Sequence, residues 1–217
     1  MQTVKSLEKY FVDIVAGLLG TRQFVWSRTR RCFVKSLAGL EQLIFVVVAR
    51  QGSGFFTVHF PAHIRFPAVE AIRSRFKVWP AAQNEKQRDL ANGASTTVVR
   101  AYPKELGAAS AIEVNPASDP VRQLDAVHRI LDAQMEWLKK FSDLNKVQQA
   151  LESESPAEWP LPLPMQRLEV LACIYVLSGD SQSLTKLIEN LRTRKKSAVS
   201  EPALAFLDQV AETLRGN

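Results

Sequence analysis

The stretch Leu43-Ile44-Phe45-Val46-Val47-Val48-Ala49 decides the fold of this chain. It is apolar on both faces of an extended backbone and rich in β-branched side chains, which is typical of a central strand covered on both sides. The two glycines of Gln51-Gly52-Ser53-Gly54 then favour a reversing turn. Residues 55–60 predict a second long strand, which ends at Pro61. We expect these two strands to form the centre of an antiparallel sheet.

A helix and a hairpin are predicted before this stretch. Between residues 3 and 19 the apolar side chains recur three or four positions apart, as on one side of an amphipathic helix, and Gly20 is a suitable end for it. The period changes to two between residues 24 and 35, on both sides of Arg30-Arg31. This alternation predicts a β-hairpin with its turn at the two arginines. Together with the strands that follow, it predicts a four-stranded antiparallel meander.

The chain beyond this sheet is predicted to be mainly helical. Pro67 suits the first turn of a second helix, and Asp119-Pro120 suits the cap and first position of a longer helix that runs to Leu138. Residues 79–93 are polar and unpatterned, which predicts a long loop. The remaining predicted elements are short strands at 96–102 and 111–114, a helix capped by Ser142 that runs to Leu151, and C-terminal helices at 165–177, 181–191 and 202–214.

These elements predict an α+β fold in three parts. Residues 1–152 form an α+β domain in which an antiparallel sheet of four or more strands, drawn mainly from residues 22–61, packs against the first helix and the helix at 119–138. Residues 153–164 contain four prolines, which exclude helix and central strand and predict a linker. Residues 165–217 form a helical C-terminal subdomain. The predicted core includes Phe11, Ile14, Phe45, Val47, Val58 and Leu131.

Composition indicates an ordinary globular protein. The 217 residues are 46% hydrophobic and 23% charged, and the longest apolar run is far shorter than the ~20 residues that span a bilayer. The N-terminus lacks the pattern of a secretory signal, so we expect a cytoplasmic protein with no membrane partner. Cys32 and Cys173 lie far apart in the sequence and are expected to be reduced, buried thiols.

Charge is distributed unevenly along the chain. The net charge is +6, yet the first 77 residues carry 12 Lys and Arg against four Asp and Glu, so the remainder is slightly acidic. Much of the excess lies in one run that interleaves cations with aromatic rings. From this run we select a speculative partner-binding set, made up of Arg22, Trp26, Arg28, Arg30, Arg31 and Lys35.

This set has two functional interpretations and one structural one. Its basic surface can meet an acidic patch on another protein, as in an interaction module. Alternatively, its cations can contact phosphates while its rings stack on bases, as in proteins that bind single-stranded nucleic acid. The structural interpretation is that Phe24 and Trp26 face the core while the arginines keep an edge strand soluble. We favour the first functional interpretation and keep nucleic-acid binding as the alternative.

The sequence offers no grouping of residues that favours catalysis. We find no nucleophile elbow, phosphate loop, zinc spacing or paired catalytic carboxylates. His59 and His63 are four residues apart, but His59 ends a predicted strand and Pro61 intervenes, so a metal site is not expected there. We therefore predict no catalytic residues, no metal and no cofactor, and we regard an enzyme as the less favoured class.

Several segments together resemble a bacterial family of unknown function, the domain of unknown function catalogued as 4304. The similar features are the leading amphipathic helix, the Arg-rich strand, the run Gly54 to Phe60 with its Phe56-Thr57-Val58 pattern, and Glu136-Trp137-Leu138-Lys139-Lys140-Phe141. The resemblance covers roughly residues 5–152. It implies an α+β fold without established chemistry. It also implies a role like that of immunity proteins, because relatives with this plan can lie near toxin genes.

Overall fold

The computed structural model describes most of the chain. The described residues are 3–52, 54–75, 98–100, 103–115, 123–153, 155, 160–161, 164–193 and 200–215. The predicted loop at 79–93 and the predicted Asp119-Pro120 cap lie outside them. None of the helices within these ranges is both long enough and apolar enough to cross a membrane.

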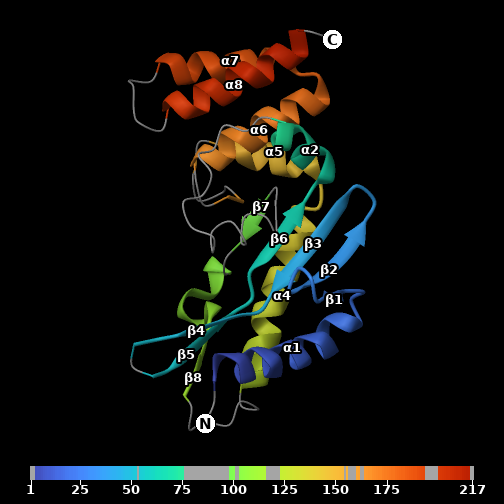
Figure 1. Ribbon diagram of the computed structural model, residues 1–217, viewed down its shortest axis with the longest axis vertical. Helices are drawn as coiled ribbons and strands as arrows, with labels where there is room; N and C mark the ends of the chain where they lie inside the picture. Colours follow the sequence, from blue (N-terminus) through green and yellow to red (C-terminus); the bar gives the residue numbers. More distant parts are fainter. Residues whose placement is uncertain are drawn as a thin grey trace. The chain divides into compact units, whose positions relative to one another are not determined.

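The chain forms two compact units, and the fold is α+β with antiparallel strand pairing and a helical C-terminal part (Figure 1). The first unit comprises Met1–Ile64 and Val99–Ser142, and the second comprises Arg65–Val98 and Asp143–Asn217. The second unit therefore includes chain on both sides of the predicted linker, in which Pro160 and Leu161 are buried. The predicted division of the chain into three parts, with boundaries after residues 152 and 164, stays a prediction.

In its described residues the first unit contains two helices, a 3₁₀ segment and two sheets with antiparallel strand pairing. One sheet has the strand order β1-β2-β3-β6-β7 and the other β4-β5-β8, with β6 and β7 at the boundary of the unit. The elements are α1 (Val4–Gly20), β1 (Val25–Ser27), β2 (Cys32–Leu37), β3 (Leu40–Phe45), β4 (Val47–Arg50), β5 (Phe56–His59), β6 (Ala62–Arg65), β7 (Val98–Arg100), η1 (Lys104–Ser110), β8 (Ile112–Val114) and α4 (Leu124–Lys140).

Helix α1 follows its sequence pattern closely. Thr3 caps it, because the Thr3 hydroxyl accepts a hydrogen bond from the Ser6 N–H at 3.1 Å while the Ser6 hydroxyl accepts one from the Thr3 N–H at 2.8 Å. This reciprocal pair satisfies N–H groups that have no partner within a helix. The buried side chains recur every four residues along one face, and they are Leu7, Phe11, Val15 and Leu19. The predicted helix is confirmed, although Val15 rather than the half-buried Ile14 continues this face.

The β1–β2 hairpin is also confirmed. It pairs Trp26 with Phe33, and its turn includes Arg31 with a positive φ of 51°. Few L-residues adopt this left-handed conformation, and here it closes the turn between the two strands. Strand β2 then pairs with β3 over its whole length, from Cys32 opposite Phe45 to Leu37 opposite Leu40.

The apolar run 43–49 is not one strand, and this prediction was wrong. Its first part belongs to β3 in the larger sheet and its last part to β4 in the smaller one, with Val46 between them. The segment that lies opposite this run in the two sheets is interrupted at the same level, between β5 and β6. There the Phe45 N–H donates to the Pro61 carbonyl at 2.9 Å, but Pro61 has no N–H with which to continue the ladder. The predicted four-stranded meander is therefore divided between two sheets, and β6 was not predicted.

The break changes which residues form the core. Val46 is buried at the break, whereas Val47 is 43% exposed, so its predicted place in the core was wrong. Phe45 is half-buried. The other predicted core residues, Phe11, Val58 and Leu131, are fully buried as expected.

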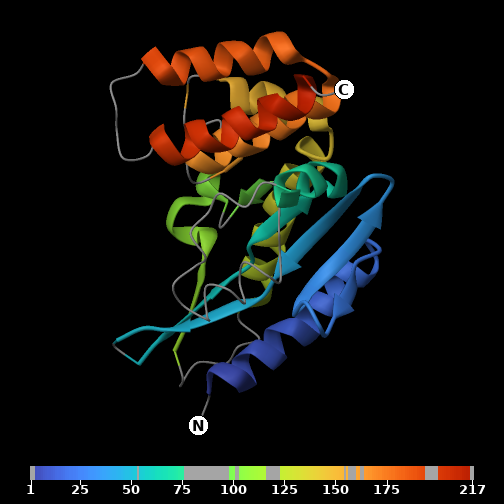
Figure 2. The ribbon, with the colours of Figure 1, turned by 45° about the horizontal axis from the view of Figure 1, so that its top comes forward.

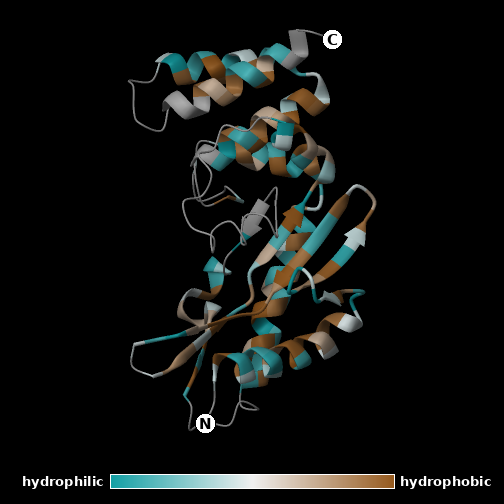
Figure 3. Cartoon of the chain, viewed as in Figure 1, coloured by the Kyte–Doolittle hydropathy of each residue, from teal (hydrophilic) through white to brown (hydrophobic). Residues whose placement is uncertain are grey.

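Both long helices of the first unit pack against its strands, as predicted. The Phe11 ring of α1 lies 6.2 Å from the Phe60 ring, centroid to centroid. The Gln134 side chain of α4 donates a 2.7 Å hydrogen bond to the Phe60 carbonyl, and Gln42 of β3 donates one to Ser142 just after α4. Figure 3 shows hydrophilic and hydrophobic patches alternating along these helices, as expected for amphipathic elements.

The described part of the second unit is helical. It contains α2 (Pro67–Arg75), α5 (Leu144–Glu152), α6 (Pro164–Ser178), α7 (Ser181–Thr193) and α8 (Ser200–Arg215), close to the predicted bounds. The cap of α5 is Asp143, which accepts from the Asn145 N–H at 2.9 Å, and not Ser142 as predicted. Helices α6, α7 and α8 lie side by side (Figure 2), and α2 and α5 pack on α6.

We predict that Ile44→Asp and Val47→Asp differ sharply, although the two residues are three positions apart in one apolar run. Ile44 is fully buried in β3, so an unpaired carboxylate there should cost several kcal/mol, on the order of breaking a buried ion pair. Val47 is exposed, so the same change should cost at most about 1 kcal/mol. Urea unfolding followed by circular dichroism measures both. Equal losses would contradict the break in the apolar run.

Candidate functional site

The six residues of the predicted partner-binding set lie on or beside the β1–β2 hairpin, and we call them the hairpin surface. Arg22 precedes β1, and Trp26 belongs to it. Arg28, Arg30 and Arg31 form or flank the turn, and Lys35 belongs to β2. The structure thus brings the set together on one supersecondary element. The contacts of each side chain decide what this surface can bind.

Three of the arginines are already paired with carboxylates of the same unit. Arg22 binds Asp132 of α4 at 2.6 Å, Arg30 binds Glu41 of β3 at 2.9 Å, and Arg31 binds Glu8 of α1 at 2.5 Å. Each ion pair offsets one positive charge of the set, although the pairs of Arg22 and Arg31 are partly solvent-exposed and therefore weak. The number of basic residues in the hairpin therefore overstates its free positive charge.

The aromatic side chains of this segment are engaged in packing. The Trp26 ring packs against the Phe33 ring at a centroid distance of 4.9 Å, and Phe33 is fully buried. The Phe24 ring is buried and lies beneath the Lys35 ammonium, whose Nζ is 6.0 Å from the ring centroid. These contacts agree with the structural interpretation of the aromatic residues. They leave few aromatic faces open for stacking on bases.

Arg28 differs from its neighbours. It is exposed, and within the described ranges no hydrogen bond or ion pair to its side chain is found. Close to it in β1, Val25 is 71% exposed, the highest value among the large hydrophobic residues found exposed. Strand β1 is the terminal strand of its sheet in the order that the structure describes. Arg28 on the turn and Val25 in the terminal strand β1 are thus two exposed positions of the hairpin at which a partner can make contact.

The two cysteines are free and fully buried, as predicted. Burial raises the pKa of the Cys32 thiol to about 11, although nearby Arg30 opposes the shift. Burial likewise raises the pKa of the Cys173 thiol to about 12. Both side chains are therefore neutral thiols at physiological pH, which is the unreactive form.

His63 is a half-buried titratable group in β6 whose Nδ1 atom is buried. Its ring lies 4.7 Å from the Phe45 ring, and among the described residues its Nδ1 atom has no hydrogen-bond partner. Burial lowers the pKa of His63 to about 4, because the charged imidazolium would lose its hydration without gaining a counter-ion. His63 is thus a neutral residue packed against Phe45.

The second unit holds a buried charge cluster that the sequence did not indicate. Arg73 of α2 donates two hydrogen bonds to one oxygen of Glu169 in α6, at 3.1 and 2.8 Å, and its guanidinium lies 3.8 Å from Glu70. The side chains of Glu70 and Glu169 are only 4% and 10% exposed. Arg73 and Glu169 are 96 residues apart, so no local pattern could pair them. The cluster fastens α2 to α6.

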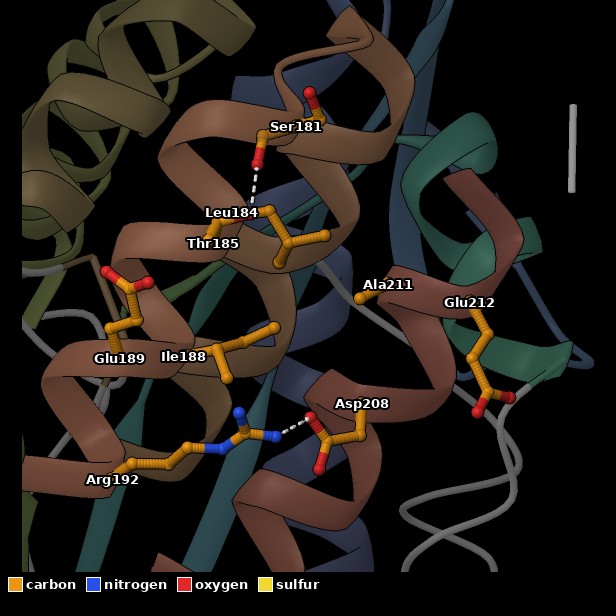
Figure 4. Close-up of a pocket in the computed structure, with 9 residues that line it drawn as sticks. All are labelled: Ser181, Leu184, Thr185, Ile188, Glu189, Arg192, Asp208, Ala211 and Glu212. Atoms are coloured by element: carbon orange, nitrogen blue, oxygen red, sulfur yellow. Dashed lines mark hydrogen bonds and ion pairs between the residues drawn. The ribbon is translucent and has the colours of Figure 1, made fainter. Parts of the chain in front are cut away.

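A groove with a volume of about 740 Å³ lies between α7 and α8 of the second unit (Figure 4). Leu184 and Ile188 of α7 form its apolar part together with Ala211 of α8. Arg192 crosses from α7 to Asp208 of α8 at 2.8 Å. The other residues that line it are Ser181, Thr185, Glu189 and Glu212. Sequence periodicity predicted both helices but not the space between them.

The described residues include no cluster of three or more His, Cys, Asp or Glu side chains able to hold a metal ion. Comparison of the chain with protein-family models, with curated proteins and with solved structures gave no match. The resemblance to the family catalogued as 4304 therefore stays a prediction.

We predict that the protein loses stability as the pH falls from 6.5 towards 4. The unfolded chain takes up a proton on His63 below about 6.5, whereas the folded chain resists it until about 4. At about 1.4 kcal/mol per pKa unit, the loss amounts to at most roughly 3–4 kcal/mol. His63→Phe should remove this slope in urea unfolding measured at several pH values, and His59→Gln should retain it. A slope unchanged in His63→Phe would assign it to other groups.

We also predict that the buried and the exposed ion pairs of the second unit differ in their contribution to stability. Arg73→Met leaves Glu169 buried without the hydrogen bonds it accepts, which should cost about 3 kcal/mol. Arg192→Met removes the partner of Asp208 in a pair whose side chains are 58% and 47% exposed, which should cost about 0–1 kcal/mol. Chemical unfolding of both variants tests this. Similar losses would mean that the Arg73 cluster is solvated.

Proposed function

We propose that this chain is a non-catalytic protein-interaction module that contacts its partner through the hairpin surface. The observation that carries the proposal is the contrast between Arg28, which is exposed and without a described partner, and the three paired arginines around it. Together with the exposed Val25, Arg28 provides a mixed apolar and cationic contact. Arginine is enriched in protein interfaces, and an extended segment can pair with an edge strand such as β1.

The same contrast favours a protein partner over nucleic acid. Phosphate binding needs several cations that release counterions from the nucleic acid on contact. Arg22, Arg30 and Arg31 would first have to give up Asp132, Glu41 and Glu8, which lowers the gain from each phosphate. Arg28, the arginine of the set without a partner among the described residues, suits a small acidic patch on a protein.

The proposal includes a cytoplasmic location and extends to a role like that of immunity proteins, which neutralise a protein partner. Two free, buried cysteines are compatible with a reducing compartment and support the location. The immunity-like role rests on the family resemblance alone. Its partner would be a protein with an exposed acidic patch.

We predict that Val25→Glu together with Arg28→Glu abolishes recovery of the partner. Tagged wild-type and variant proteins are expressed in the native host, and co-purified proteins are quantified by mass spectrometry. The matched control is Leu124→Glu with Lys139→Glu, which makes the same change in charge and also replaces an exposed apolar residue, on α4. We expect one stoichiometric partner to be retained by the control and lost from the hairpin variant. A partner recovered equally with both variants would overturn the hairpin surface as its site.

Fluorescence anisotropy with single- and double-stranded DNA and RNA tests the alternative function, which is nucleic-acid binding through the hairpin surface. Binding through about three phosphate contacts should weaken by roughly a decade or more between 50 and 200 mM salt. We expect at most weak binding at physiological salt. Submicromolar binding that is lost in Arg28→Glu with Arg30→Glu, while circular dichroism shows an intact fold, would replace the proposal with a nucleic-acid-binding function.

A further inference from the structure

The short loop between β2 and β3 determines which way the backbone groups of β2 point. Only two residues separate the strands, so Leu37 and Leu40 on either side of the loop form a hydrogen-bonded pair. Hydrogen-bonded and non-hydrogen-bonded positions alternate along an antiparallel pair. The N–H and C=O groups of Phe33 therefore point towards β3, whereas those of Val34 and Cys32 point towards β1.

An observed hydrogen bond agrees with this alternation. Phe45 is opposite Cys32, at a non-hydrogen-bonded position of the β2–β3 pair, so its N–H group must point away from β2. This N–H donates to the Pro61 carbonyl at 2.9 Å. The alternation that follows from the loop is thus the one that the sheet has.

The same alternation leaves one residue of β1 with its backbone groups directed away from the sheet. Val25 and Ser27 are opposite the two β2 residues whose groups point towards β1, so both are hydrogen-bonded to β2. Trp26 lies between them, and its N–H and C=O therefore point to the other side. Strand β1 ends its sheet in the order that the structure describes (Figure 1). Among the described residues, neither group of Trp26 has a hydrogen-bond partner on that side.

A row of apolar side chains on one face of this sheet also ends at β1. Leu43 of β3 is opposite Val34 of β2, and Val34 is opposite Val25 of β1. Exposure rises along the row, because Leu43 is 1% exposed, Val34 is half-buried and Val25 is 71% exposed. A strand added beside β1 would place a further side chain next to Val25, and such cross-strand pairs stabilise a sheet.

We propose that β1 binds an extended acidic segment of the partner protein by strand addition. This inference rests on the function proposed above and specifies how the partner is recognised. One partner residue exchanges two backbone hydrogen bonds with Trp26, and the next covers Val25 with an apolar side chain. A carboxylate at the other end meets Arg28, which directly follows β1 and is exposed. The added strand is antiparallel to β1, since this pairing is the more stable per residue.

The probe for this site is the capped synthetic peptide Thr-Asp-Thr-Ile-Val-Thr. In antiparallel register its Ile lies opposite Trp26, its Val opposite Val25 and its Asp near Arg28. Titration into the isotope-labelled full chain is followed by ¹H–¹⁵N NMR, which detects weak binding. We expect the Trp26 amide signal to shift as the peptide binds. A peptide with Lys in place of Asp should bind about threefold more weakly, and equal binding of the two would overturn the acidic character of the partner.

Two N-methylated forms of the peptide give the decisive comparison. A methyl group on the Ile nitrogen removes the donor to the Trp26 carbonyl and should weaken binding at least about tenfold. A methyl group on the Val nitrogen, which points away from β1, should leave the affinity nearly unchanged. Equal effects of the two methyl groups, or no binding of the parent peptide, would overturn strand addition.

A pair of variants makes the same test on the protein. Trp26→Pro and Trp26→Ala both lack the indole ring, but only proline also lacks the N–H. Proline is compatible with an edge strand where its missing N–H faces out of the sheet. We expect the peptide to bind the Pro variant at least about tenfold more weakly than the Ala variant. Equal affinities, with both folds intact by circular dichroism, would overturn strand addition while recovery of the partner still tests the hairpin surface.

A second copy of this chain is the competing occupant of the edge. Two paired β1 strands would bring the cations of two hairpins together, which disfavours this dimer. Sedimentation velocity should therefore give the same oligomeric state for the wild type, Trp26→Pro and Trp26→Ala. A dimer that dissociates only in Trp26→Pro would assign the edge to a second copy and overturn the assignment to an acidic partner.

Discussion

The hydrogen bond from the Gln134 amide of α4 to the Phe60 carbonyl is the contact on which the first unit depends. Phe60 lies where the ribbon of β3–β4 and β5–β6 breaks, beside Pro61, which has no N–H to donate. A backbone carbonyl buried at such a break needs a partner from elsewhere, and Gln134 is fully buried against it. Since Phe11 of α1 packs on the same Phe60 ring, both long helices are fixed to this one point.

The charge pattern of the hairpin follows from this arrangement. With α1 and α4 both held against the sheet, Glu8 of α1 comes within reach of Arg31, and Asp132 of α4 within reach of Arg22. The helices that complete the core therefore also neutralise the surface next to it. A count of Lys and Arg along the sequence cannot show this, because net charge is a sum whereas binding depends on which charges stay unpaired.

Local pattern predicted the elements well and their assembly only in part. Helix α1 and the β1–β2 hairpin are visible in the sequence because their periods of 3.6 and 2 depend on near neighbours. The break at Val46 is not visible there, because its cause is Pro61 on the opposite strand. The contacts of the site could not be predicted either, because their partners lie far apart in the sequence. Arg22 and Asp132 are 110 residues apart, and Arg73 and Glu169, which join α2 to α6, are 96 residues apart. Helix pattern did predict α7 and α8, but periodicity does not specify a groove.

The second unit contains both a buried and an exposed ion pair, and the two differ in whether their charges are available for binding a ligand. Arg73 is committed to Glu169 in the interior, where breaking the pair would leave a buried carboxylate, so it cannot be exchanged for a ligand. Arg192 and Asp208 are solvated, so their pairing joins two helices at little cost to either charge. By the same reasoning Arg28, exposed and without a partner among the described residues, holds the positive charge that the hairpin has available. The charge available for recognition is therefore set by which side chains stay unpaired, and not by the number of Lys and Arg.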